Sequence, residues 1–363
     1  MSFLEQFEPK AIVKRLENLL TLDALKSKHV LHVGTGNLFG GVENIMLSIA
    51  RVTASEGRKH AFAYCYEGRL AEELRLSGAE MLRYPAFRYS NPFSLVHARN
   101  HFSRLLEVNS FETVIFYAPW TYDALSGIAV KMGAKIVFWA MNYLGKGILD
   151  LFMRWRCPNY LLACSQDVLN SYAGFKKLER SQVVYPPVEG RVNGSNEKIE
   201  TKKKVGADQN AAVILMASRL DFYKGHTLLI QGLGELVKRS GIPNWQVWIA
   251  GGVQKKSDLK YLQNLKKLAG SLGLENKILW LGQRNDVLEL MRCADVFCQP
   301  NIGPEPFGVV FVEAQMAGCR VITTNMGGAR EAVEKCTANR LIDKPCPFLL
   351  ADCLQEVLKE KVA

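Results

Sequence analysis

The stretch that decides the fold reads NIGPEPFGVVFVEAQMAGCRVITTNMGG and runs from Asn301 to Gly328. It carries two carboxylates, Glu305 and Glu313, on either side of a Pro-Phe-Gly turn, and most residues around them are apolar. A helical pattern followed by the apolar run RVITT is typical of an α/β unit. The two acids could be a catalytic pair, two salt-bridge partners, or two contacts on one long ligand.

A helix is expected to begin near Phe307 or Gly308 and to run through VVFVEAQMAG. The first amides of such a helix have no partners within it and carry the positive end of its dipole. They therefore form an anion site that suits a phosphate. Gly308 lets a ligand approach the backbone closely.

The spacing of the two acids bears on their role. At roughly 1.5 Å of rise per residue, the backbones of Glu305 and Glu313 lie up to about 12 Å apart. The two carboxylates of a glycosidase lie roughly 5–9.5 Å apart across one bond. The spacing therefore favours a long ligand with an anion in its middle, and a nucleotide diphosphate sugar has that shape. The plainer alternative, a helix-start acid and a surface acid, suits Glu313 less well because its neighbours are apolar.

The composition bounds the class of protein. The chain has 363 residues, 48% of them hydrophobic, which is enough for a sizeable core and for two domains. A net charge of +11 favours an anionic partner, although charge that keeps copies of the chain apart explains it equally well. Lysines and arginines are spread over both halves without a long basic run, so no nucleic-acid partner is expected.

Cysteine usage and the start of the chain indicate a compartment. Nine cysteines occur without a C-x-x-C pair, which is not the spacing of a disulfide framework or a zinc site. Acids occupy the N-terminal stretch where a signal peptide needs an apolar run, and no run of about 18 apolar residues follows. We therefore expect a cytoplasmic protein without a membrane span.

Short apolar runs alternate with helical patterns in the first half of the chain. These runs are HVLHV (29–33), HAFAYCY (60–66), TVIFYAP (113–119), KIVFWAM (135–141) and NYLLACS (159–165). The alternation restarts with AAVILMAS (211–218), WQVWIAGG (245–252), KILWLG (277–282), DVFCQP (295–300) and RVITT (320–324). Continuous apolar strands that alternate with helices predict parallel sheets buried on both faces.

A polar stretch, PPVEGRVNGSNEKIETKKKVG (186–206), separates the two series. The predicted fold class is therefore α/β, with two Rossmann-like, doubly wound domains facing across a cleft. We expect an N-terminal domain over residues 1–188, a linker over 189–206 and a C-terminal domain over 207–363. Ligands of open α/β sheets bind beyond the carboxyl ends of strands, so the loops there deserve the closest inspection.

One such loop, SRLDFYKGH, places Arg219 and Lys224 just beyond the first strand of the second half. Two cations at a strand end can neutralise a diphosphate and stabilise it as it leaves. For either residue alone, an exposed basic loop would be the simpler explanation. The acid pair in the stretch after DVFCQP favours the functional explanation, in which both cations bind a diphosphate.

A second loop, GTGNLFGGVEN, follows the first strand of the chain. A dinucleotide fingerprint needs glycine at its sixth position, which is Phe39 here, so a nicotinamide site is not expected. Gly40 and Gly41 still allow a close backbone approach in front of a helix.

Together these residues resemble glycosyltransferase family 4, which has the GT-B fold. The resemblance covers nearly the whole chain and is strong from SRLDFYKG through WIAGG to EPFGVVFVEAQMAGCRVITTNMGG. The E-x-F-G-x-x-x-x-E pattern from Glu305 to Glu313, followed by A-x-x-x-G-x-x-V-I and then G-G, is specific. The family implies retaining transfer of a sugar from a nucleotide-activated donor, with no cofactor and no required metal. The chain also contains no D-x-D triplet.

The resemblance implies a role for each acid and each cation. Arg219 and Lys224 would hold the diphosphate of the donor and so support catalysis. Glu305 would contact the hydroxyls of the donor sugar, and Glu313 would contact the ribose of the nucleotide.

The resemblance also implies backbone contacts with the donor. The amides around Phe307, Gly308 and Val309 would bind phosphate, in agreement with the anion site argued above. Gly40 and Gly41 would border the phosphates and the acceptor.

The chain departs from the family in its first half and at its C-terminal end. Members often carry a histidine near the donor sugar, but the comparable strand ends, YAPWTYD and WAMNYLGKG, contain none. Asn142 or Tyr143 is expected to take that place. A retaining transfer does not need the histidine if the leaving phosphate accepts the proton. The family's usual final helices also look abbreviated after NRLIDKPCPF.

A last segment, KGILDLFMRWRC (146–157), mixes cations with large apolar residues. It is expected either to form an interfacial helix on an anionic membrane near the acceptor or to pack into the core. The favoured function is a glycosyltransferase acting on a glycan, glycolipid or lipid-linked acceptor, in cell-surface polysaccharide synthesis. The alternative is a donor-binding but inactive subunit that regulates or completes a partner transferase.

Overall fold

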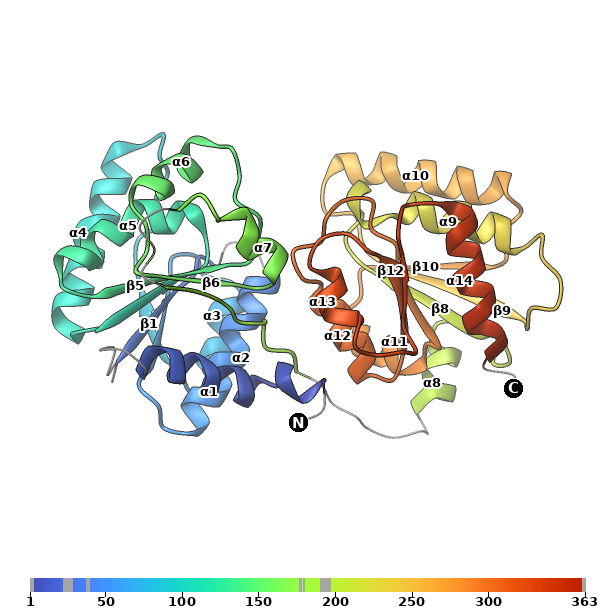
Figure 1. Cartoon of the computed structure of the whole chain (residues 1–363), viewed down its shortest axis with the longest axis horizontal. Helices are drawn as coiled ribbons and strands as arrows, with labels where there is room; N and C mark the ends of the chain where they lie inside the picture. The colour runs from blue at the N-terminus through green and yellow to red at the C-terminus, as the bar shows by residue number, and fades with distance from the viewer. Residues whose placement is uncertain are drawn as a thin grey trace. The chain divides into compact units, whose positions relative to one another are not determined.

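The computed structural model describes residues 3–21, 29–36, 40–175, 178, 180–189 and 197–360. The chain forms two compact units, Met1–Glu189 (unit 1) and Gly190–Ala363 (unit 2). Each unit has one parallel sheet with helices on both faces (Figure 1). The alternation of apolar strands and helices in the sequence predicts this layering.

The sheet of unit 1 has seven parallel strands in the order β3-β2-β1-β4-β5-β6-β7. Its strands are β1 (Val30–Val33), β2 (His60–Tyr64), β3 (Glu80–Arg83), β4 (Thr113–Phe116), β5 (Lys135–Ala140), β6 (Tyr160–Ala163) and β7 (Arg180–Val183). Its helices are the short 3-10 turn η1 (Glu5–Phe7), then α1 (Pro9–Thr21), α2 (Gly41–Ser55), α3 (Arg69–Ser77), α4 (Pro92–Asn109), α5 (Pro119–Lys131), α6 (Ile148–Trp155) and α7 (Gln166–Ser171).

Local signals in the sequence start the helices of unit 1. Pro119 occupies the first turn of α5, where its missing amide costs nothing. The side chain of Asn91 accepts a hydrogen bond from the Ser94 amide and caps α4. The large buried side chains of the core include Phe62 of β2 and Trp139 of β5, which belong to one buried cluster.

A buried polar network crosses the sheet of unit 1. His32 forms hydrogen bonds with the Tyr117 hydroxyl at 2.7 Å and with the His60 ring at 2.9 Å. Nε2 of His60 lies 3.6 Å from a carboxylate oxygen of Glu17, which also pairs with Arg58. Burial lowers the pKa of His32 well below its usual value and that of His60 to about 4. Both rings are therefore neutral at physiological pH.

The sheet of unit 2 has six parallel strands in the order β10-β9-β8-β11-β12-β13. Its strands are β8 (Ala212–Ala217), β9 (Trp245–Ala250), β10 (Ile278–Gly282), β11 (Val296–Gln299), β12 (Arg320–Thr324) and β13 (Arg340–Ile342). Its helices are α8 (Glu197–Lys204), the 3-10 turn η2 (Phe222–Lys224), α9 (His226–Leu236), α10 (Lys256–Ser271), α11 (Val287–Cys293), α12 (Val309–Met316), α13 (Ala329–Val333) and α14 (Pro347–Glu360).

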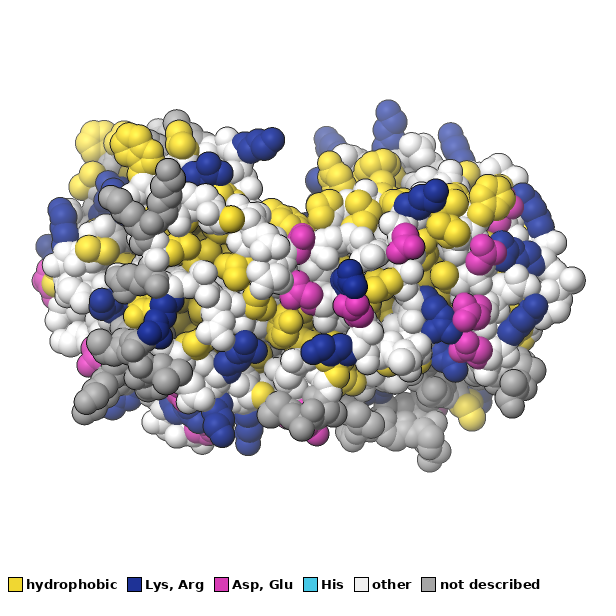
Figure 2. Space-filling view, viewed as in Figure 1, with side chains coloured by type: hydrophobic (Ala, Val, Ile, Leu, Met, Phe, Trp, Pro, Cys, Tyr) yellow, Lys and Arg dark blue, Asp and Glu magenta, His cyan; other side chains and the backbone are white. Residues whose placement is uncertain are grey.

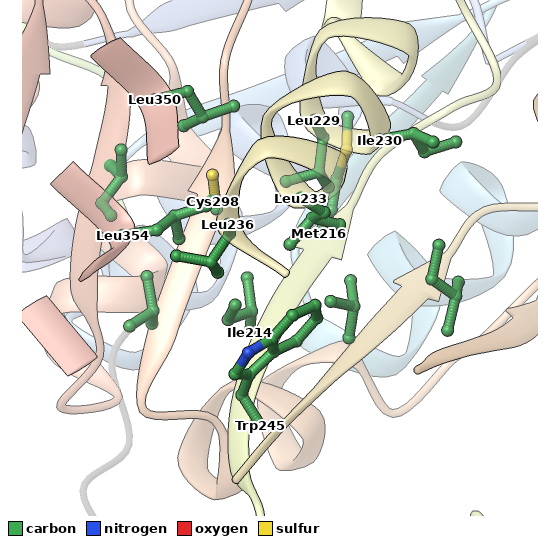
Figure 3. Close-up of a cluster of buried hydrophobic side chains, with 14 of the residues drawn as sticks. Ile214, Met216, Leu229, Ile230, Leu233, Leu236, Trp245, Cys298, Leu350 and Leu354 are labelled. Carbon is green, nitrogen blue, oxygen red and sulfur yellow. The ribbon is translucent and has the colours of Figure 1, made fainter. Parts of the chain in front are cut away.

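Helices α9 and α14 close one face of the unit 2 core. Figure 3 shows Leu233 of α9 and Leu354 of α14 in the same buried cluster as Met216 of β8. The two helices approach closely at Gly232, where an added Cβ would lie 2.7 Å from the side chain of Leu350. Burial of these aliphatic side chains is the main stabilising term of unit 2.

The central strands of both sheets follow the predicted runs, but three edge strands do not appear in them. β3, β7 and β13 are short, and their residues are mostly exposed or half-buried. Edge strands lack the continuous apolar pattern because only one side of each is covered.

The predicted linker also contains a helix, α8, which packs against α11. Its sequence EKIETKKK consists mostly of good helix formers, and it buries Thr201. The rest of that linker, residues 190–196, lies outside the described residues.

Each sheet reverses its winding at one place. β1 lies between β2 and β4 in unit 1, and β8 lies between β9 and β11 in unit 2. Connections that leave toward opposite faces open a crevice beyond the carboxyl ends of the central pair. In unit 2 this crevice lies beyond β8 and β11, where the loops predicted to bind a ligand begin.

Candidate functional site

The loop after β8 positions Lys224. The Asp221 side chain accepts a hydrogen bond from the Tyr223 amide and starts the turn η2. Gly225 ends the turn with φ of +83°, and a Cβ there would lie 1.8 Å from the carbonyl oxygen of Pro300. Only glycine permits this close approach, which brings Lys224 against the segment that follows β11.

Lys224 and Glu305 meet at this point. The ammonium of Lys224 donates a hydrogen bond to Oε2 of Glu305 over 2.7 Å. The side chains of Lys224 and Glu305 are 23% and 13% exposed, so the pair is largely screened from water yet reachable. Two residues predicted from separate loops, 81 positions apart, therefore share one site.

Asn301 supplies a second donor to the same carboxylate. The sequence did not predict it as a site residue. Its side-chain amide donates to Oε2 of Glu305 over 3.0 Å. Asn301 is itself held by the Gln299 amide at 3.1 Å and, through its carbonyl oxygen, by the Thr324 hydroxyl at 2.5 Å. The only signal in the sequence is that two amide residues follow an apolar strand at its carboxyl end.

The backbone of Glu305 is fixed as well. Its amide donates to the carbonyl oxygen of Met326 over 3.2 Å, and its carbonyl oxygen accepts from the Gly328 amide over 2.7 Å. Glu305 and Gly327 thus form a short parallel bridge. The two ends of the segment 301–328 therefore lie side by side, and the glycine pair after β12 forms this contact.

Helix α12 begins directly after this bridge. Gly308 precedes the helix with φ of +87°, and a Cβ there would fall 2.3 Å from the Phe311 ring. The helix starts at Val309, one or two residues later than expected, and its first amides lack partners within it. Together with Phe307, which is buried, these residues form the turn for which anion binding stays a prediction.

Glu313 lies in the second turn of α12. Its neighbours Val312 and Ala314 are fully buried, while Glu313 keeps part of its surface exposed. Burial raises the pKa of its carboxyl to about 7. A carboxyl with a pKa near 7 exchanges between its neutral and charged forms around physiological pH.

A pocket of about 150 Å³ opens beyond the carboxyl ends of β8, β9 and β10. It is lined by Ala217, Ser218, Arg219, Ala250, Gly251, Gly252, Gln254, Gln283, Arg284 and Val287. Arg219 is exposed at this pocket, next to the loop that carries Lys224. Arg284 pairs with Asp286, which raises the pKa of the guanidinium and lowers that of the carboxyl. No sequence pattern predicts that Gln283 and Arg284 line this pocket.

The candidate residues of unit 1 follow β1 and β5. Gly40 caps α2, and its amide donates to the Glu43 carboxylate over 3.1 Å, while Gly41 is the first residue of the helix. Asn142 is exposed after β5, and its carbonyl oxygen accepts from the Tyr172 hydroxyl at 3.3 Å. Phe39, which breaks the dinucleotide fingerprint, lies outside the described residues.

The described parts of the chain contain neither a metal-ligand cluster nor a membrane-spanning helix. No group of three or more His, Cys, Asp and Glu side chains gathers there as metal ligands do. No helix there is both long and apolar enough to cross a bilayer.

Comparisons with known proteins show which proteins this chain resembles in sequence and in fold. Residues 197–362 match the family model described as glycosyl transferases group 1. A D-inositol 3-phosphate glycosyltransferase of Corynebacterium efficiens is 31% identical over 162 residues, which cover 44% of this chain and 38% of the relative. The chain thus spans less than half the length of this curated relative.

Two solved structures share the fold over most of the chain. Anabaena HepE, crystallised with UDP and glucose, has a TM-score of 0.77 at 19% identity, covering 92% of this chain and 91% of its own. A glycosyltransferase from Rickettsia africae has the same TM-score at 21% identity, with the same two coverages. The chain is therefore a GT-B protein, and the predicted fold class is confirmed. The match of the second unit to the model of glycosyl transferases group 1 agrees with the resemblance predicted from the sequence.

Proposed function

We propose that this protein transfers a sugar from a nucleotide diphosphate sugar to an acceptor with retention of configuration. The observation that carries the proposal is the contact between Lys224 and Glu305 beside the start of α12. A cation, a hydroxyl-binding carboxylate and unpaired helix amides within one crevice suit a ligand that is anionic in its middle and polyhydroxylated at its end.

Each part of the donor has a matching group in unit 2. Lys224, Arg219 and the first amides of α12 neutralise the diphosphate. Glu305 accepts hydrogen bonds from hydroxyls of the sugar, and Glu313 accepts them from the ribose. The pocket beside Arg219 takes the base, because it adjoins the diphosphate-binding loop and is lined largely by backbone and small residues.

The reaction breaks the bond between the anomeric carbon and the diphosphate oxygen and forms one between that carbon and an acceptor oxygen. Negative charge develops on the leaving phosphate, where two cations and the helix amides stabilise it. That phosphate oxygen accepts the proton of the acceptor hydroxyl on the same face of the sugar. Lys224 and Arg219 supply positive charge that a metal ion supplies in other transferases, so we propose metal-independent transfer.

The relatives support the donor class and leave room for several acceptors. The matched proteins are named as glycosyltransferases, and the Anabaena structure holds UDP and glucose. We propose a glycan, glycolipid or lipid-linked acceptor at the cytoplasmic side of cell-surface polysaccharide synthesis. Gly40, Gly41 and Asn142 of unit 1 are the residues proposed to border it.

The test combines donor binding with transfer. Melting temperature is measured with UDP-, GDP-, ADP- and dTDP-sugars and with NAD as a control, because a ligand of the folded state raises it. The class that raises it is then used in a transfer assay with Glu305→Gln and Lys224→Met. Both variants are expected to lose nearly all transfer while remaining folded, and Lys267→Met, at an exposed residue of α10, is the matched control.

Two results would contradict the proposal. Full transfer in Glu305→Gln and Lys224→Met would remove these residues from the site. Nucleotide binding without transfer or donor hydrolysis by the wild-type protein would instead favour a donor-binding subunit that completes a partner transferase.

A further inference from the structure

Large hydrophobic side chains are exposed together on one side of unit 1. We call this the α4–α6 surface, and its apolar members are Tyr89, Phe93, Val96, Leu151 and Trp155. Phe93 is 88% exposed and Trp155 is 83% exposed, values at which such side chains gain nothing from the core. Several exposed aromatic and aliphatic side chains on neighbouring elements are typical of an interaction site.

Polar contacts join the elements that carry this surface. The first turns of α5 lie between α4 and the end of α6. There the Tyr89 hydroxyl donates to the Asp123 carboxylate over 2.8 Å, and the Arg156 guanidinium donates to the Asp123 carbonyl oxygen over 3.2 Å. Arg99 of α4 reaches the Ala124 carbonyl oxygen over 2.9 Å. These contacts hold α4 and the end of α6 against the same part of α5.

Basic side chains are interspersed with the apolar ones. Lys146, Arg154 and Arg156 are exposed around α6, and Met153 of that helix is buried. The nearby acid Asp150 accepts a hydrogen bond from the Gly147 amide over 3.0 Å. Figure 2 shows hydrophobic and basic side chains next to one another over this end of unit 1.

We propose that the α4–α6 surface docks on an anionic lipid bilayer. A helix that exposes tryptophan and leucine between arginines suits the headgroup region, where apolar side chains enter and cations meet phosphates. The loop between β5 and α6 also carries Asn142, so docking brings that loop to the lipid surface.

This inference does not rest on transfer activity, because it concerns binding alone. The full chain is mixed with vesicles of phosphatidylcholine and with vesicles in which about 30% of this lipid is replaced by phosphatidylglycerol, and bound protein is separated by flotation. Binding is expected only to the anionic vesicles. It should weaken as salt is raised, since screening reduces the attraction to headgroups.

Two variants separate the apolar and the electrostatic parts. The double variant Phe93→Ser and Trp155→Ser should reduce partitioning by at least about tenfold, because it removes two exposed aromatic side chains that would enter the lipid. The double variant Lys146→Glu and Arg154→Glu should reduce it by a similar factor, at roughly 1 kcal/mol per cation. All four side chains are exposed, so folding should be unchanged, which a thermal melt checks.

Matched controls use equally exposed residues elsewhere. Leu76→Ser changes a side chain that is 84% exposed on α3, and Lys267→Glu changes an exposed cation of α10. Both should bind vesicles like the wild type. The proposal is overturned if the wild type ignores anionic vesicles or if the controls lose as much binding as the variants. It is also overturned if the aromatic variant binds normally, which would indicate a general polyanion surface.

Discussion

At the residue scale, Glu305 is the centre of the site, because its Oε2 accepts hydrogen bonds from both Lys224 and Asn301. Lys224 was expected from the sequence, whereas Asn301 was not. Asn301 acts as a positioning residue: it orients the carboxylate, and the buried Gln299 orients Asn301 in turn. A charge-assisted hydrogen bond of this kind contributes about 1.5–3 kcal/mol.

Replacing Asn301 by aspartate should disturb this arrangement more than replacing it by serine. Asn301→Asp removes the donor and places a second negative charge against Glu305, where the two carboxylates compete for Lys224. We expect kcat to fall about tenfold to hundredfold, with a higher apparent pKa on the acid side of the kcat profile. Asn301→Ser should retain more activity and an unshifted profile. Equal losses with unshifted profiles would mean that Asn301 only maintains packing.

The carboxyl of Glu313 should make the proposed nucleotide binding depend on pH. Its pKa of about 7 reflects burial without a partner for the charged form. Ribose hydroxyls that donate to the carboxylate should lower that pKa, so binding near pH 6.5 should release a proton. Calorimetry in buffers of different ionisation enthalpy measures this release. The nucleotide's own phosphate accounts for some of the released protons. Glu313→Gln should abolish the remainder. Unchanged proton release in this variant would show that Glu313 does not contact the ribose.

At the element scale, two glycines let loops meet where a side chain would prevent it. Gly225 permits the η2 turn to touch Pro300 at the end of β11. Gly225→Ala should therefore cost more than about 2 kcal/mol of unfolding free energy and displace Lys224. Gly273→Ala is the control, since Gly273 has a similar φ of +69° with open space around it. It should cost only about 1–2 kcal/mol. Chemical denaturation of both variants measures the difference.

The sequence predicts the central elements well and the edges poorly. Strands such as β8 are apolar at every position, so burial on both faces is visible in the residues. β7 reads RSQV, and half of it is exposed, so nothing distinguishes it from a loop.

The same contrast holds in the site. Lys224 and Glu305 belong to local patterns, while Gln283 and Arg284 line the pocket only because the sheet brings β10 beside β9. No local pattern encodes that placement. Whether Asn142 replaces the histidine of related transferases stays a prediction.

At the scale of the whole molecule, buried titratable groups lower the stability at both ends of the pH range, some at acid pH and one at alkaline pH. His60 in unit 1 and His226 in unit 2 each have a pKa of about 4 because burial disfavours the charged ring. The unfolded chain binds their protons from about pH 6.5 downward, so stability is lost as pH falls toward 4. Glu313 acts in reverse, since its raised pKa makes stability fall as pH rises from about 4.5 to 7.

The free energy of unfolding should therefore be largest at about pH 7, where the opposing proton uptakes of the two histidines and of Glu313 balance. Each of the three groups contributes up to roughly 3 kcal/mol across its range. Denaturation at a series of pH values tests this expectation. Glu313→Gln should flatten the decline on the alkaline side, and His60→Gln should weaken the decline on the acid side. A profile that Glu313→Gln leaves unchanged would show that this carboxyl titrates normally.

The ion pair between Lys224 and Glu305 has a consequence for the proposed transfer. Each side chain holds a partner that resembles part of the proposed substrate: a cation in place of hydroxyls, and a carboxylate in place of phosphate. A complete donor would replace both partners at once, whereas a nucleoside diphosphate would replace only one and leave Glu305 to recapture Lys224. After the proposed transfer, Glu305 would therefore compete with the leaving nucleotide for Lys224. The ion pair proposed to recognise the donor would thus also help to release the product.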